Sequence, residues 1–467
     1  MVQIPILSGI YADATPDFRT SYPRNLVPVP KETGISQGYL RPGEGIVAGG
    51  TGPGLNRGGY NWNDVLYRVM GTKLVSISSA NVVTVIGDVG GSDRVTMTHG
   101  FTYLAIASGE KLFLYNGTTL QEVTDPDLGV VLDVVWVDGY FMTTDGEFLV
   151  VTELNDPFSV DPLKYGSSEA DPDPIKSILK LRNEVYALNR YTVEVFDNLG
   201  TTGFPFARIT GAQIQKGTVG TFANCVFMEA IAFVGGGRSE APAVYVGANG
   251  STGKISTREI DEILAEYTEA ELTLTYLEER AFNSHDHLII HLPRHTLVYD
   301  GEASRALQTP VWFTLASSLV GDSKWFAQSV IWVYDKWNVG HPNTAQFGYL
   351  DKTISTHWGE KIGWEFGTQI VYNESNGAIF HQLELVSLTG QVAFGVIPTI
   401  WTQYSSDGET FSVEKPITAG TTGERTKRLV WFQQGHMRNW RIQRFRGTSD
   451  AHVAAVRLEA RIEPLAF

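Results

Sequence analysis

The sequence contains almost no cysteine, and this scarcity excludes several kinds of scaffold and site. Cys225 is the single cysteine in 467 residues, so the chain forms no internal disulfide. It also cannot build a zinc site from several thiolates. A chain of this size without disulfides suits a reducing compartment.

Long apolar runs are also missing. No stretch approaches the roughly 20 apolar residues that a membrane-spanning helix needs. The first residues, MVQIPILSGIYADATPDF, lack the basic start and apolar core of a secretion signal. We therefore expect neither a membrane span nor a secretion signal.

Basic residues are fewer than acidic ones. The chain has 36 Lys and Arg against 51 Asp and Glu, which gives a net charge of −15. This balance argues against general affinity for nucleic acid or anionic membranes, because both are negatively charged. DNA can still pass through a smooth acidic channel, because the acidic wall repels the phosphates and so does not bind them.

Glycine and aromatic residues are abundant, and a hairpin pattern recurs. The 48 glycines and 11% aromatic content are typical of turn-rich all-β proteins. A short apolar strand, a tight turn and a second apolar strand follow one another seven times. The turns lie near Gly71, Gly109, Asp145, Asn189, Arg238, Pro293 and His341. Their spacing of about 36 to 55 residues is that of four-stranded propeller blades.

These features predict an all-β fold: a β-propeller of about six to seven blades, with an array of β-sandwiches as the alternative. We expect an extended N-terminal segment over 1–60 and the propeller over 61–364. A β-rich region over 365–467 is either a closing blade or a separate β domain. One short helix is expected near 257–270, in STREIDEILAEYTEAEL, because its apolar residues recur on one helical face.

Four of the ten histidines fall in FNSHDHLIIHLPRH, residues 282–295, and raise the question of a metal site. The segment fits the sixth hairpin, with its turn at Pro293 and Arg294. Strand geometry then brings His291 and His295 near each other across the turn and spreads His285 and His287 along the edge. We therefore predict a structural or interface role and no metal.

Two other signals are open to more than one interpretation. The turn SSDGETF, 405–411, resembles the Asp-box of sialidase propellers, but it is one residue short, ends in Phe411 and does not recur. The basic stretch near the C-terminus could be an interface or contact a DNA backbone with stacking aromatics. Its candidate residues are Arg438, Arg441, Arg444 and Arg446. No catalytic residues and no cofactor are predicted.

The histidine segment resembles a signature of the packaged-DNA-stabilisation proteins, the tail hubs or nozzles of short-tailed double-stranded DNA bacteriophages. The matching residues are Phe282, Ser284, His285, His291, Leu292, Pro293, Arg294, His295, Leu297, Val298, Tyr299 and Asp300. Asn283 departs from the family's acidic residue, and His287 occupies a position that can be apolar. The segment GYLRPGEGI, 38–46, is also similar, and the likeness extends over residues 1–300.

This resemblance implies a structural tail hub without enzymatic activity. Such a protein forms a ring, usually a hexamer, below the portal and the head-completion adaptor, and carries a tail needle or plug. Tailspikes or fibres attach around it. The ring retains packaged DNA and later forms part of the ejection conduit, through which double-stranded DNA passes without sequence recognition. The expected location is the virion tail, after synthesis and assembly in the host cytoplasm.

Two other functions are compatible with the residues. A propeller that binds or hydrolyses glycans would bring several carboxylates to its central funnel. A DNA-binding role would use the four C-terminal arginines and would weaken as salt is raised.

Overall fold

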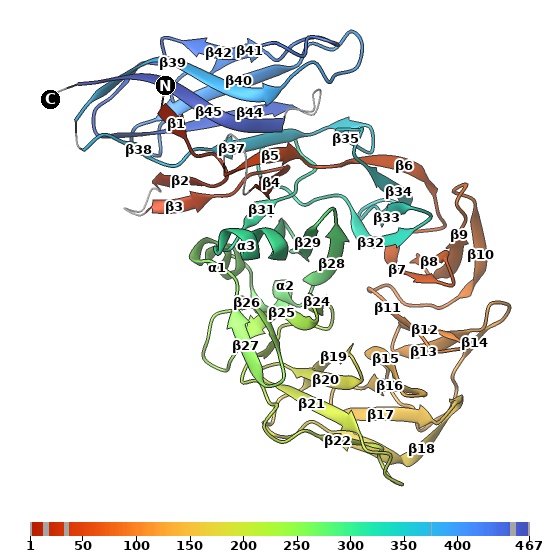
Figure 1. Cartoon of the computed structure of the whole chain (residues 1–467). Coiled ribbons are helices and arrows are strands. Elements are labelled where there is room, and N and C mark those ends of the chain that lie inside the picture. The colour runs from red at the N-terminus through yellow and green to blue at the C-terminus, as the bar shows by residue number, and fades with distance from the viewer. Residues whose placement is uncertain (1, 13–17, 32–36, 375, 449–453, 466–467) are drawn as a thin grey trace.

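The computed structural model describes residues 2–12, 18–31, 37–374, 376–448 and 454–465. It contains a ring of seven β-sheets and, above it, a β-sandwich built mainly from the C-terminal strands (Figure 1). The predicted all-β propeller is thereby confirmed. Among these residues no helix has the length and hydropathy needed to cross a membrane.

Each of the first four blades is a four-stranded antiparallel sheet whose strands follow one another along the chain. Blade 1 consists of β7 (Asn56–Trp62), β8 (Val65–Met70), β9 (Lys73–Ile77) and β10 (Val83–Asp88). Blade 2 consists of β11 (Thr96–His99), β12 (Leu104–Ser108), β13 (Lys111–Tyr115) and β14 (Leu120–Glu122). Blade 3 consists of β15 (Asp133–Val137), β16 (Tyr140–Thr144), β17 (Phe148–Glu153) and β18 (Asp156–Ser167). Blade 4 consists of β19 (Ile175–Leu181), β20 (Glu184–Asn189), β21 (Val193–Asn198) and β22 (Phe206–Arg208).

The last three blades vary this plan. Blade 5 consists of β23 (Gly217–Thr218), β24 (Asn224–Phe227), β25 (Ala230–Gly236), β26 (Ala243–Ala248) and β27 (Ser251–Lys254). Blade 6 consists of β28 (Tyr276–Phe282), β29 (His285–His291), β30 (Thr296–Asp300) and β31 (Trp312–Thr314). Blade 7 consists of β32 (Gln328–Val333), β33 (Lys336–Gly340), β34 (Gln346–Asp351) and β6 (Gly45–Thr51), extended by β35 (Thr356–His357) and β36 (Glu360–Lys361).

The seventh blade closes the ring with a strand from the N-terminal part of the chain. Strand β6 pairs antiparallel with β34, so that Ile46 lies opposite Leu350. The innermost strands of neighbouring blades contact one another all the way round, and β32 meets β7 to complete the circle. This closure leaves only the short outer strands as edges.

The recurring hairpins of the sequence form the middle of the blades. Strands β12 and β13, for example, are joined by Gly109 and Glu110, which have φ values of +58° and +63°. Two consecutive positive φ values define the tight turn whose twist matches paired strands. A Cβ atom on Gly109 would also lie 3.1 Å from the Cα atom of Gly91.

The C-terminal region is a β-sandwich and not a closing blade. One sheet has the order β4 (Leu26–Pro30), β5 (Gly38–Pro42), β45 (Ala454–Pro464), β39 (Ala378–Leu388), β42 (Leu429–Phe432), with β1 (Val2–Ile4) beside β45 and β43 (His436–Met437) beside β39. The facing sheet has the order β37 (Gly363–Gly367), β44 (Trp440–Thr448), β40 (Thr399–Ser405), β41 (Lys415–Thr418), with β38 (Val371–Tyr372) beside β44. A separate pair joins β2 (Gly9–Ala12) to β3 (Phe18–Ser21). A core that includes Phe380, Phe445 and Trp431 fills the space between the two sheets.

The prediction of a single helix near 257–270 is wrong, because the structure has two helices there. The structure has α1 (Arg258–Ala265) and α2 (Glu269–Leu272) in the predicted region, because Thr268 and Glu271 form a capping box that starts a new helix. A third helix, α3 (Gly301–Leu307), follows β30, and the Asp300 side chain accepts the Ala303 N–H at its start.

Candidate functional site

The histidine-rich hairpin is formed by β29 and β30 in the middle of blade 6. Its register sets His287 opposite Asp300 and His291 opposite Thr296. Residues 285 and 287 point to the same face because side chains alternate along a strand. Two of the four histidines and one acidic residue thus meet at the end of the hairpin near α3.

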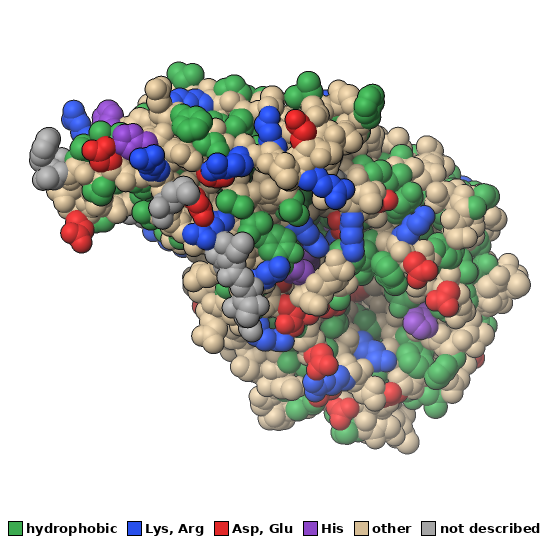
Figure 2. All heavy atoms as spheres, turned by 45° about the horizontal axis from the view of Figure 1, so that its top comes forward, with side chains coloured by type: hydrophobic (Ala, Val, Ile, Leu, Met, Phe, Trp, Pro, Cys, Tyr) green, Lys and Arg blue, Asp and Glu red, His purple; other side chains and the backbone are tan. Residues whose placement is uncertain are grey.

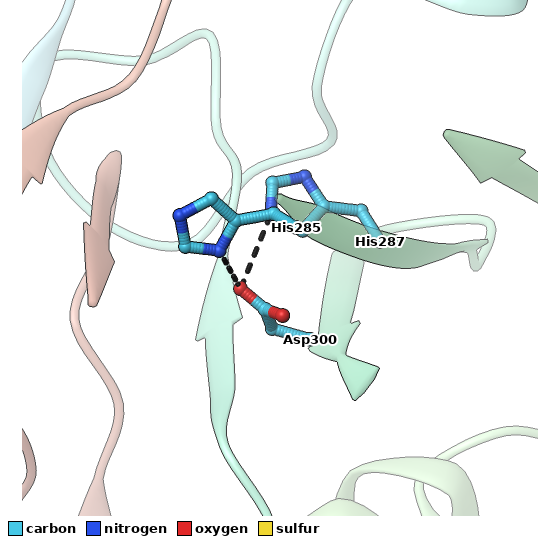
Figure 3. A group of neighbouring side chains, drawn as sticks. All are labelled: His285, His287 and Asp300. Carbon is cyan, nitrogen blue, oxygen red and sulfur yellow. Dashed lines mark hydrogen bonds and ion pairs between the residues drawn. The ribbon is translucent and has the colours of Figure 1, made fainter. Parts of the chain in front are cut away.

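His285, His287 and Asp300 form a buried cluster (Figure 3). His285 Nδ1 and Asp300 Oδ2 are 2.5 Å apart, and His287 Nε2 lies 3.4 Å from the same oxygen. The other carboxylate oxygen, Oδ1, accepts the Ala303 N–H at 2.9 Å. All three residues are at most 5% exposed. One carboxylate therefore joins two strands to the start of α3.

The potential ligand atoms of this cluster lie within 4.8 Å of one another, close enough to raise the question of a metal ion. Two ligand atoms on one tetrahedral zinc ion are about 3.3 Å apart, given bonds of about 2.0 to 2.1 Å. The distance from His287 Nε2 to Asp300 Oδ2 fits this value, but the 2.5 Å from His285 Nδ1 is that of a hydrogen bond. The geometry is that of a triad held by the His285–Asp300 hydrogen bond, with His287 in close contact, and the absence of a metal stays a prediction.

The charges around the triad favour an ionised carboxylate. Burial alone would raise the pKa of Asp300, but the hydrogen bond from His285 and the nearby His287 ring hold it well below its usual range. Burial lowers the pKa of His287, and Asp300 offsets only part of this shift. Arg280, opposite His287 on β28, forms a buried ion pair with Glu44. The Arg280–Glu44 pair thus lies on the strand beside the triad and joins β28 to the turn between β5 and β6.

His291 lies apart from the triad, in a stack of flat side chains. Its ring stacks on Tyr276 with centroids 4.1 Å apart, and Trp325 is parallel to it at 6.2 Å. The Arg94 guanidinium covers the far side of Tyr276 at 3.5 Å from the ring centroid. Burial lowers the pKa of His291 well below its usual value, so the ring is neutral and serves packing.

Arg294 and His295 hold the helical insertion against the hairpin. His295 Nδ1 and the Tyr267 hydroxyl are 2.6 Å apart. Arg294 donates to Glu271 Oε1 at 2.9 Å and lies over the Tyr267 ring. His295 therefore does not join His291, and Pro293 lies in the turn between the two strands. Tyr299, on β30, packs against Trp312 of the outer strand. His291, Arg294, His295 and Tyr299 thus have structural contacts within the protein.

The four C-terminal arginines do not form one basic surface. Arg441 is 1% exposed and lies between Phe380 and Tyr404, where it donates to the Gln434 carbonyl and to Gln443. The prediction of an interface or DNA-facing side chain is therefore wrong for Arg441, because it is a buried part of the sandwich.

The other three arginines differ in environment. Arg444 lies 3.5 Å from Glu365, and Arg446 donates to Glu414 at 2.5 Å. Both are half-buried, whereas Arg438 is exposed. A continuous phosphate-binding surface would need several exposed cations side by side.

The turn that resembles an Asp-box lies in the sandwich, after β40, and not in a propeller blade. The Asp407 carboxylate accepts the N–H groups of Glu409 and Thr410 at 3.0 and 2.8 Å. Its hydrogen bonds to Thr410 and Ser405 hold the pKa of Asp407 well below its usual range. The carboxylate therefore stabilises its own turn.

Buried histidines make stability depend on pH, and His357 is one of them. This residue is 3% exposed, and burial lowers its pKa to about 4. The unfolded chain binds a proton there near pH 6.5 and the folded chain only near pH 4, so stability falls as the pH falls. His357 alone should lower the free energy of unfolding by about 2 kcal/mol between pH 7.5 and 5.0.

The measurement is chemical denaturation of the protein and of His357→Asn at both pH values. Asn keeps a hydrogen-bonding group for the Ser317 hydroxyl, which lies 2.8 Å from His357 Nδ1, but does not titrate. The loss of stability at low pH should be smaller in the variant by about 2 kcal/mol. Equal losses in the two proteins would contradict the assignment.

A β-propeller followed by a β-sandwich is the architecture of one family of bacteriophage proteins, and the sequence matches that family over both parts. The chain belongs to the bacteriophage P22 Gp10 family: the β-propeller description matches residues 2–355 and the β-sandwich description residues 363–463. This confirms the resemblance found in the hairpin signature.

A curated relative spans nearly the whole chain. The tail hub protein gp10 of Salmonella phage P22 is 30% identical over 459 residues, which cover 93% of this chain and 94% of the relative. Solved propellers are more distant. The WD40 domain of Neurospora crassa Pan2 has 10% identity and a TM-score of 0.42, and covers 66% of this chain and 94% of its own. BamB from Moraxella catarrhalis has 9% identity and a TM-score of 0.37, with 70% and 94% covered.

Proposed function

We propose that this chain is a structural tail hub of a bacteriophage virion. The observation that carries the proposal is the match to the P22 tail hub protein along almost the whole length, through the propeller and the sandwich alike. The protein acts by forming a rigid part of the tail and not by catalysis.

The contacts of the signature residues support a structural role. Asp300 joins two strands to a helix, Arg294 and His295 fix an insertion, and His291 packs in an aromatic stack. Such groups, hydrogen-bonded and packed within the fold, give stiffness and leave little for substrate. A component that resists the pressure of packaged DNA needs this stiffness.

The proposed assembly is a homohexameric ring below the portal and its head-completion adaptor, with a tail needle or plug at its tip. Tailspikes or fibres attach around the ring, which is built in the host cytoplasm. The ring retains packaged DNA and later forms part of the ejection conduit. The net charge of −15 supports passage of double-stranded DNA without sequence recognition, because an acidic wall does not hold phosphates.

Electron microscopy of the purified chain mixed with portal–adaptor complexes tests this proposal. Averaged images should show a closed ring, with one copy of the chain repeated by rotation, below the adaptor. A chain that remains a monomer and leaves portal–adaptor complexes bare would overturn the proposal. Release of reducing sugar from host surface glycans would favour a glycan-hydrolysing protein instead.

A further inference from the structure

A cleft opens where the sandwich meets the seventh blade, and its lining combines cations with apolar side chains. We call it the junction cleft. It has a volume of about 930 Å³ and is formed by the turn between β5 and β6, the turn after β34, and the loop that follows β39. Lys and Arg side chains are visible along this boundary on the face shown in Figure 2. The cleft belongs to neither the hairpin triad nor the propeller axis.

Three cations line the cleft: Arg41, Lys352 and Arg425. Neither Arg41 nor Arg425 pairs with a carboxylate in the described part of the chain. The acid of the lining, Glu44, is already bound by the buried Arg280. The cleft therefore has an excess of positive charge in a protein whose net charge is −15. An arginine fork is well suited to a carboxylate from another chain.

The loop after β39 gives the cleft an apolar rim. Val392, Ala393 and Val396 of this loop line the cleft, and Phe394 and Ile397, next to them in the chain but outside the lining, are 95% and 62% exposed. The loop is held in place, because the Gly390 carbonyl accepts the Gly423 N–H and the Val392 carbonyl accepts the Thr422 hydroxyl. Exposed apolar side chains gathered on one short loop, beside an apolar cleft lining, are more indicative of a contact surface than a single exposed residue.

We infer that the junction cleft binds a peptide segment of another virion protein, in which acidic and apolar side chains are close together. Arg41 and Arg425 would receive the carboxylates, and the rim around Phe394 would cover the apolar side chains. Nucleic acid fits less well, because an apolar lining and rim offer nothing to a phosphate backbone.

A second copy of this chain is the competing occupant, because a rotational ring brings two different surfaces of neighbouring copies together. The crosslinking experiment distinguishes it from another virion protein. The inference rests on the proposed function only in taking the partner to be a virion protein.

Photo-crosslinking in assembled particles tests the inference. A photo-reactive phenylalanine analogue is placed at position 394, and the crosslinked peptide is identified by mass spectrometry. The matched control carries the analogue at position 101, where Phe101 is 88% exposed on the propeller, far from the cleft. Position 394 should give a crosslink to a segment of a different virion protein that contains Asp or Glu beside apolar residues, and position 101 should not.

Charge reversal completes the test. The double variant Arg41→Glu and Arg425→Glu should lower the crosslink yield about tenfold, as loss of close charge pairs predicts. Arg438→Glu reverses an exposed arginine of the sandwich outside the cleft and should leave the yield unchanged. A crosslink to a second copy, to DNA or to no partner in assembled tails would overturn the inference and leave the tail-hub proposal standing. Absence of the chain from tails would overturn the tail-hub proposal itself.

Discussion

The variant Ile46→Asp should prevent the propeller from closing. Ile46 is 1% exposed on β6, the strand that completes blade 7, and it packs in a core with Val298, Phe313 and Leu350. A carboxylate there has no cation to pair with in that apolar core. Burying it should cost about 4 kcal/mol or more, the upper end of single-residue effects. Because β6 is the strand that joins blade 7 to the N-terminal part of the chain, the damage should spread to the whole ring.

The measurements are the yield of soluble protein, near-ultraviolet circular dichroism and the rate of limited proteolysis. Ala48→Asp is the matched control, because Ala48 lies on the same strand and is exposed. This control should fold, with a loss of less than about 1 kcal/mol. If Ile46→Asp were as soluble and as resistant to protease as Ala48→Asp, β6 would not be the closing strand.

Removal of the Arg68 side chain should have an effect of similar size. Arg68 is fully buried on β8, and it donates to Asn56 Oδ1 at 2.9 Å and to the Ser329 carbonyl at 3.0 Å. Burial lowers its pKa to about 10, so it stays charged at neutral pH. Arg68→Ala leaves two buried acceptors without a donor and opens a cavity between blades 1 and 7. We expect a loss of about 3 to 5 kcal/mol in the stability of the propeller.

Chemical denaturation followed by tryptophan fluorescence measures this loss. Lys73→Ala provides the comparison, since Lys73 pairs with Asp88 at 2.7 Å on the surface of the same blade. An exposed ion pair contributes at most about 1 kcal/mol. Equal unfolding midpoints for the two variants would show that Arg68 does not hold the blades together.

The sequence predicts local structure well and distant pairing poorly. The seven hairpins were found because each strand pair and its turn lie within a few residues, as at Gly109 and Glu110. Strand β6 is separated from its partner β34 by about 300 residues, so no local pattern reveals their pairing. The region expected as an extended segment over 1–60 in fact supplies strands to a blade and to the sandwich.

For the candidate site too, the sequence predicts local features well and contacts between distant residues poorly. The triad escaped prediction because Asp300 follows the histidines by 13 residues or more, and only the hairpin register brings it opposite His287. A search for carboxylates at the far end of the returning strands would have found it. Arg441 was misjudged because arginine in an alternating strand usually faces solvent, whereas here two aromatic rings and two amide groups surround it.

The pairing of β1 with β45 joins the first strand of the chain to the last, and this order constrains synthesis. While the ribosome is still making the final hundred residues, β1, β4 and β5 have no complete sheet to enter. Strands β4 and β5 can pair with each other early, but β1 has no partner until β45 has been made. Completion of this sheet is therefore a late step of folding, and the edge that β1 presents stays open until that step.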